Sequence, residues 1–137
     1  MPRRNQELAR RGLDAFSSGD LEQSLATMDP EVEWHVAFQL PDLPPDTTVV
    51  RGHEGVRRLW NAFRSGFEEV TVDLEEVVYD AGDVLIARVR FRARGAGSGI
   101  EVDRRLYYLQ RIRDERLKLI RPFDTLEEAR AAAGLDA

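Results

Sequence analysis

Hydrophobic residues along the first third of the chain recur first at helical spacing and then at every second position. The early pattern predicts an amphipathic helix that ends at residues 17–19, Ser-Ser-Gly. A second short helix is predicted from Asp20, whose side chain can cap it, as far as Asp29-Pro30. From Glu31 apolar and polar residues alternate, which predicts a half-buried strand that runs to Phe38.

The rest of the chain predicts one more helix, a run of four strands and a closing helix. Residues 41–46 are rich in proline, so they predict a loop over an opening. Because the connections between the four strands are short, neighbouring strands must run antiparallel, as in a meander. The helix is expected from Gly52 to about Gly66, the strands at about 70–79, 84–94, 100–113 and 116–122, and the closing helix from Thr125, with Glu128 completing a capping box, to Gly134.

Pairing these strands residue by residue places polar groups on the apolar face of the sheet. If Asp80 pairs with Asp83, then Glu76 lies opposite the small Ala87. The same register gives one layer made of Glu76, Ala87, Tyr108 and Arg121, with Arg104, opposite Phe91, also pointing inward. Polar groups on an apolar face are costly unless they are paired or solvated, so this layer predicts a wet pocket or an internal network. The alternative is that Glu76 meets solvent at the sheet edge and has no function, and a slip of one residue would turn these side chains to the other face.

The opposite face of the sheet predicts ion pairs rather than a basic patch. The register places Asp73 across from Arg90 and Glu75 across from Arg88, and opposite charges in such positions stabilise a sheet modestly. The alternating arginines on this face are Arg88, Arg90, Arg92 and Arg94. We therefore expect a solvated outer face on which these arginines have acidic partners.

Composition narrows the class of protein. With 137 residues, of which 42% are hydrophobic, the chain can build one core, so we expect a single domain over residues 1–137. A formal net charge of -5 disfavours a nucleic-acid partner. No apolar run could span a bilayer and no signal peptide is evident, so we expect a cytoplasmic protein without a membrane partner. Without cysteine, and with only His35 and His53, no metal site and no cofactor are expected.

The order of the predicted elements and a set of short segments point to a known fold. The segments are 18–21 (Ser-Gly-Asp-Leu), 29–34 (Asp-Pro-Glu-Val-Glu-Trp), 51–56 (Arg-Gly-His-Glu-Gly-Val), 82–84 (Gly-Asp-Val), 97–102 (Gly-Ser-Gly-Ile-Glu-Val), and Phe123 with 127–129 and 133–135. Together they resemble the SnoaL-like and ketosteroid isomerase-like branch of the nuclear transport factor 2-like superfamily. The resemblance implies an α+β single-domain cone of order ααβ-loop-αββββα, whose helices pack in the concave face of a strongly curved, mainly antiparallel sheet. It also implies a homodimer, which would cover the outward apolar residues Val77, Tyr79, Val84 and Ile86.

The groups that steroid isomerisation requires are missing at the matching positions. The resemblance places the family's tyrosine at Gly12, its aspartate base at Trp34 and its second aspartate at or near Tyr108. The Arg-x-Asp of the related epoxide hydrolases is matched only by residues 88–90, Arg-Val-Arg. SnoaL-like cyclases need an acid or base in the pocket, and Glu76 is the inward carboxylate that the predicted register offers.

The sequence therefore predicts a pocket for a small apolar or aromatic ligand. Its expected lining is Phe16, Trp34, Trp60, Tyr108 and Phe123, with Glu76, Arg104 and Arg121 as polar groups. Two functions stay open. One is a cofactor-free isomerase, cyclase or hydrolase that acts by proton transfer, with Glu76 as base and Tyr108 as oxyanion donor. The other is a non-catalytic ligand-binding or dimeric assembly module, and if the register differs, His35 becomes the natural base.

Overall fold

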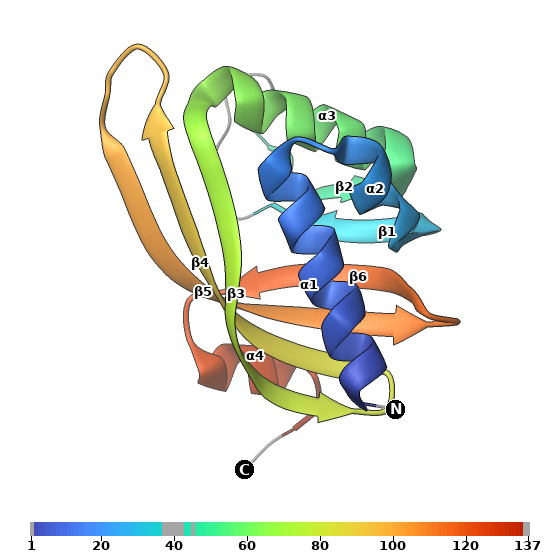
Figure 1. Ribbon diagram of the computed structural model, residues 1–137. Helices are drawn as coiled ribbons and strands as arrows, with labels where there is room; N and C mark the ends of the chain where they lie inside the picture. Colours follow the sequence, from blue (N-terminus) through green and yellow to red (C-terminus); the bar gives the residue numbers. More distant parts are fainter. Residues whose placement is uncertain (1, 37–42, 45, 136–137) are drawn as a thin grey trace.

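A six-stranded curved sheet wraps around helices in the computed structural model, which describes residues 2–36, 43–44 and 46–135 (Figure 1). The elements are α1 (Pro2–Ser18), α2 (Leu21–Ala26), β1 (Met28–His35), β2 (Val49–Arg51), α3 (Gly52–Gly66), β3 (Phe67–Ala81), β4 (Val84–Gly95), β5 (Glu101–Arg113), β6 (Arg116–Phe123) and α4 (Leu126–Ala132). The sheet order is β2-β1-β6-β5-β4-β3. The predicted α+β class and its cone-shaped sheet are confirmed. Half of the predicted loop at 41–46 and the end of the first predicted strand lie outside the described residues.

Local signals set the helix ends as predicted. Asp20 caps α2 by accepting a hydrogen bond from the Gln23 N–H at 3.1 Å. Thr125 and Glu128 form the predicted capping box at the start of α4. α2 is shorter than expected because the chain is already paired as β1 from Met28.

One pair of neighbouring strands in the sheet is parallel and therefore cannot be joined by a hairpin. β1 runs parallel to β6, with Trp34 beside Ile120, while the other pairs are antiparallel. The short β2 pairs with β1 at the edge. Three residues cannot show an alternating pattern, so the sequence did not predict β2.

The concave face of the sheet holds the main core. α1 and α3 lie over this face (Figure 1), and their buried side chains pack on inward residues of the strands. At the wide part of this core, five rings pack together: Phe16, Trp34, Phe63, Phe67 and Phe91, with neighbouring centroids 5.4–6.1 Å apart. We call this group the aromatic cluster.

Two bulges in β3 overturn part of the predicted register. Leu74 pairs with Val89 as expected, but β3 then carries an extra residue at Glu75 and another at Val78. Glu76 consequently lies opposite Arg88 on the outer face, and the predicted pairing of Glu76 with Ala87 is wrong.

A bulge also shifts the register of β6. The β5–β6 register slips at Lys118, so Tyr108 lies opposite Pro122 and Arg121 lies opposite Leu109. The predicted pairing of Tyr108 with Arg121 is therefore also wrong, whereas Tyr108 opposite Ala87 and Arg104 opposite Phe91 are confirmed.

α4 covers part of the outer face of the sheet, opposite α1 (Figure 1). Its Ala129 packs with Val84, Ile86 and Leu109, which are at most 9% exposed. Val77 packs on the inner side instead. Because the chain itself buries Val84 and Ile86, the apolar surface on which the homodimer was predicted is largely covered, and the homodimer stays a prediction.

The remainder of the outer face carries the expected ion pairs. Glu75 binds both Arg88, at 3.3 Å, and Arg105, at 2.9 Å. Asp73 binds Arg92 at 2.8 Å rather than Arg90, its neighbour across the strands. Within the described ranges, no helix is long and apolar enough to cross a membrane.

Candidate functional site

A cleft opens where β1 and β6 end. Because these two strands are parallel neighbours, their carboxyl ends meet at one edge of the sheet, beside β5 and the start of α4. The cleft has a volume of about 340 Å³. Its lining includes His35, Arg104, Leu106, Arg121, Pro122 and Phe123.

The charges in the cleft are unevenly balanced. Arg104 binds the Asp124 carboxylate at 2.6 Å. Glu128, also at the cleft, is engaged in the capping box of α4. The Arg121 guanidinium lies over the Phe123 ring, 4.8 Å from its centroid, and forms no ion pair with the described part of the chain. Arg121 therefore leaves positive charge available to a ligand.

His35 lies beside Arg121 and is held in its neutral form. Its side chain is 27% exposed, and its Nε2 atom lies 3.9 Å from a Glu33 carboxylate oxygen. Partial burial, followed by the positive charge of Arg121, lowers the pKa of His35 and outweighs the opposing effect of Glu33. At neutral pH the imidazole is thus a base and a hydrogen-bonding group, not a fixed charge.

An NMR pH titration of the two histidine rings tests this electrostatic picture. We expect the His35 pKa to lie below the usual value of about 6.5, and to rise in Arg121→Gln because a neighbouring positive charge is lost. His53→Gln identifies the signals without altering the cleft. A His35 pKa at or above the usual value would contradict the assignment of burial and Arg121 as the causes.

The predicted pocket residues fall into two groups. Arg104, Arg121 and Phe123, predicted for an inner pocket, line this cleft instead. Phe16 and Trp34, at 3% and 5% exposed, belong to the aromatic cluster, where their centroids are 5.4 Å apart. Trp34 thus points into the core and does not line the cleft.

Trp60 packs against the same core from α3. Arg64 lies 4.9 Å from the centroid of its ring. The buried indole Nε1 has no hydrogen-bond partner among the described residues.

Tyr108 is buried behind the wall of the cleft. It is 5% exposed, and its partner across the strands, Pro122, lines the cleft. Its hydroxyl has no hydrogen bond to any residue that the structure describes. Burial raises the pKa of Tyr108, despite the opposing charge of Arg104. The phenol therefore stays protonated at neutral pH and can donate a hydrogen bond.

Glu76 does not join these residues. Its side chain is 56% exposed and pairs with Arg88 at 3.0 Å on the outer face. The two residues predicted to act together, Glu76 and Tyr108, therefore lie on opposite faces of the sheet. The geometric basis for Glu76 as a base in the pocket is lost.

His35, rather than Glu76, lies at the cleft as a candidate base. In the sequence, His35 has the outward parity of Glu31 and Glu33, which favoured a surface position. The available signal was its place at the end of a strand next to a loop, where binding residues gather. The sequence could not show that His35 lies near β6, because the parallel pairing of two strands far apart in the chain has no local sequence pattern.

The chain belongs to the SnoaL-like domain family, whose profile matches residues 9–120. Among solved structures, it is similar to a nuclear transport factor 2-like protein of unknown function from Burkholderia pseudomallei, with 19% identity, a TM-score of 0.75, and 93% of this chain and 95% of that chain covered. A putative SnoaL-like polyketide cyclase from Jannaschia sp. CCS1 has 22% identity and a TM-score of 0.71, over 89% and 85%. A Mycobacterium tuberculosis protein in complex with estradiol-17β-hemisuccinate has 16% identity and a TM-score of 0.69, over 90% and 95%. No curated protein sequence matches the chain.

Proposed function

We propose that the cleft binds a small, mostly apolar molecule that carries one acidic group. The acidic group lies at Arg121, within reach of His35, and the apolar body lies against Leu106, Pro122 and Phe123. The observation that carries this proposal is the guanidinium of Arg121, which lies at the mouth of the cleft with a ring contact but no carboxylate partner among the described residues.

Charge balance explains why an acidic ligand is favoured over a neutral one. Asp124 neutralises Arg104, so a ligand gains little there. Arg121 has no such partner, and a carboxylate or phenolate can form a charge-assisted hydrogen bond with it. The Mycobacterium tuberculosis protein is described with a steroid hemisuccinate, a molecule with an apolar body and a carboxylate, which is the same ligand chemistry on the same fold.

A second candidate, proton-transfer catalysis without a cofactor, is favoured by the lowered pKa of His35. A neutral imidazole beside Arg121 can remove a proton next to a carbonyl, while the guanidinium of Arg121 stabilises the enolate that forms. A putative polyketide cyclase shares the fold. Exchange of α-protons of an aryl ketone for deuterium, lost in His35→Gln, would support this role, and binding without exchange would leave a non-catalytic module.

Ligand binding is tested with a matched pair of probes, 1-naphthoate and the uncharged 1-naphthamide. We expect a change in tryptophan fluorescence, because Trp34 lies next to His35 in β1. Arg121→Gln should weaken naphthoate binding about fivefold to tenfold and leave the amide almost unchanged, since one charge-assisted hydrogen bond is lost.

Arg113→Gln is the control, because it removes the same charge from an exposed residue of β5 outside the cleft. Equal binding of the two probes, or equal losses in Arg113→Gln and Arg121→Gln, would contradict an acid-selective site at Arg121.

A further inference from the structure

His35 and Arg121 lie side by side at the cleft. The residues before them, Trp34 and Ile120, pair across the parallel strands β1 and β6, and both are buried in the core. Because side chains alternate along a strand, His35 and Arg121 both point to the opposite face, from strands that lie about 5 Å apart. Both line the cleft, so one group of a ligand can contact the two side chains together.

The nearest charged groups keep the His35 ring neutral in the free protein. Glu33, two residues earlier in β1, favours the protonated ring, but the same carboxylate also pairs with Arg51 of β2 at 3.5 Å. Arg51 and Arg121 both oppose a second positive charge at His35, and so does its partial burial. A proton on His35 therefore needs a further negative charge beside the ring.

The charged groups that reach the cleft from β5 and from the start of α4 are already engaged. Arg104 binds Asp124 at 2.6 Å, and Glu128 takes part in the capping box of α4. These contacts exist without a ligand. The change in charge at His35 on binding therefore comes from the ligand itself.

A negatively charged group at Arg121 supplies that charge. It offsets the repulsion between the guanidinium and a protonated His35, and it attracts the imidazolium directly. A carboxylate has two oxygens, so one can accept a hydrogen bond from Arg121 and the other from His35. The apolar body of the ligand buries the ring further, which favours the neutral form. His35 is already partly buried, however, at 27% exposed, so a charge-assisted hydrogen bond outweighs this added burial.

We propose that an acidic ligand brings a proton with it to His35, so that an imidazolium and a guanidinium hold its acidic group together. This inference rests on the proposed function, because it requires an acidic group at Arg121. By linkage, a ligand that favours protonation of His35 must bind more tightly to the protein in which His35 is already protonated. Affinity should therefore rise as the pH falls toward the pKa of His35 in the free protein, and level off below it.

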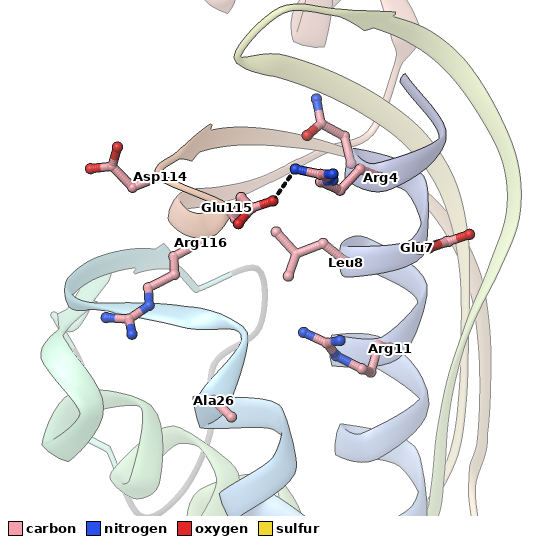
Figure 2. Close-up of a pocket in the computed structure, with 9 residues that line it drawn as sticks. Arg4, Glu7, Leu8, Arg11, Ala26, Asp114, Glu115 and Arg116 are labelled. Carbon is pink, nitrogen blue, oxygen red and sulfur yellow. Dashed lines mark hydrogen bonds and ion pairs between the residues drawn. The ribbon is translucent and has the colours of Figure 1, made fainter. Parts of the chain in front are cut away.

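The larger hollow between α1 and the turn that joins β5 to β6 offers no such pair of groups (Figure 2). It has a volume of about 410 Å³, and its arginines are accompanied by three carboxylates, those of Glu7, Asp114 and Glu115. Glu115 pairs with Arg4, drawn as a dashed line in Figure 2. No histidine is among the described residues that line this hollow, so we expect no proton-coupled binding of an acid there.

A fluorescence titration of the full chain with 1-naphthoate, between about pH 5 and about pH 8, tests the coupling. The carboxylate of this probe stays ionised throughout, because the range lies above the usual carboxyl pKa of about 4. If the contact raises the pKa of His35 by about one unit, affinity increases about tenfold from the upper to the lower pH. The uncharged 1-naphthamide should change less than about twofold. Calorimetry in buffers of different ionisation enthalpy measures the proton taken up.

Three variants assign the proton. His35→Gln should bind naphthoate with an affinity that varies less than about twofold over the range, because glutamine does not titrate. His53→Gln is the matched control: the His53 ring lies 3.1 Å from the Met28 carbonyl oxygen, outside the cleft, so this variant should keep the gain. Arg121→Gln should weaken binding at every pH.

The outcomes distinguish this inference from the proposed function. Naphthoate binding that depends on Arg121 but not on pH would overturn the proton coupling and leave the acid site standing. A gain that persists in His35→Gln, or that is equal for naphthamide, would also overturn the coupling. Failure of naphthoate to bind at any pH would overturn the proposed function, and this inference with it.

Discussion

Replacing Phe91 with alanine is expected to lower the free energy of unfolding by about 3–5 kcal/mol, the usual cost of removing a large ring from a core. Phe91 is 1% exposed, and its ring centroid lies 5.7 Å from that of Phe63 and 5.8 Å from that of Phe67. The substitution would leave a cavity between β4, α3 and β3 that well-packed neighbours can fill only in part. Urea denaturation at a fixed pH measures the change.

Two further variants separate a cavity from a general loss of apolar surface. Phe91→Leu should cost about 1–2 kcal/mol, because leucine fills part of the same volume. Ile100→Ala, at a side chain that is 67% exposed, should change stability by less than about 0.5 kcal/mol. A loss in Phe91→Ala no larger than that in Ile100→Ala would mean that the aromatic cluster is not the packed centre of the core.

The aromatic cluster also explains why the site lies beside the predicted pocket rather than within it. Trp34 occupies the position that the family resemblance gives to an aspartate base, and its ring packs on Phe16 instead of leaving a polar space. The polar groups are found further out, where His35 and Arg121 reach the cleft. A large ring at an inner position therefore moves the available space toward the ends of β1 and β6.

The order of the elements could be predicted because each depends on nearby residues. The cap at Asp20 and the capping box at Thr125 are sequence patterns with a direct physical cause. The meander follows from short connections, and those connections allow only antiparallel neighbours. The parallel pairing of β1 with β6 joins strands far apart in the chain, and no residue pattern in either strand predicts it.

The register failed where the alternation itself breaks. In the second half of β3 the alternating pattern is interrupted at Glu75-Glu76 and at Val77-Val78, and each of these pairs contains one bulge residue. In β6 the slip at Lys118 precedes the apolar pair Leu119-Ile120. A register that pairs the strands residue by residue misses such pairs of like residues, because a bulge places two residues opposite one. The positions of Glu76 and Arg121 depended on these bulges, so both were misplaced.

Raising the pH above about 10, where tyrosine in an unfolded chain loses its proton, is expected to destabilise the protein through Tyr108. Burial raises the pKa of Tyr108 in the folded state, so the folded chain holds this proton more tightly than the unfolded chain does. Below pH 10 both states are protonated and the contribution of Tyr108 is complete. Above pH 10 only the unfolded state ionises readily, and stability falls by about 1.4 kcal/mol for each pH unit.

Comparing Tyr108→Phe with Tyr107→Phe isolates this effect. Tyr108→Phe keeps the ring and removes the hydroxyl, which has no hydrogen bond to the described residues, so it should change stability little at pH 7 and remove most of the alkaline loss. Tyr107, half-buried on the face that α4 covers, should retain the loss when replaced. Urea denaturation at several pH values, followed with tyrosinate absorbance, measures both. An unchanged alkaline slope in Tyr108→Phe would mean that this phenol ionises in the folded state, against the effect expected from its burial.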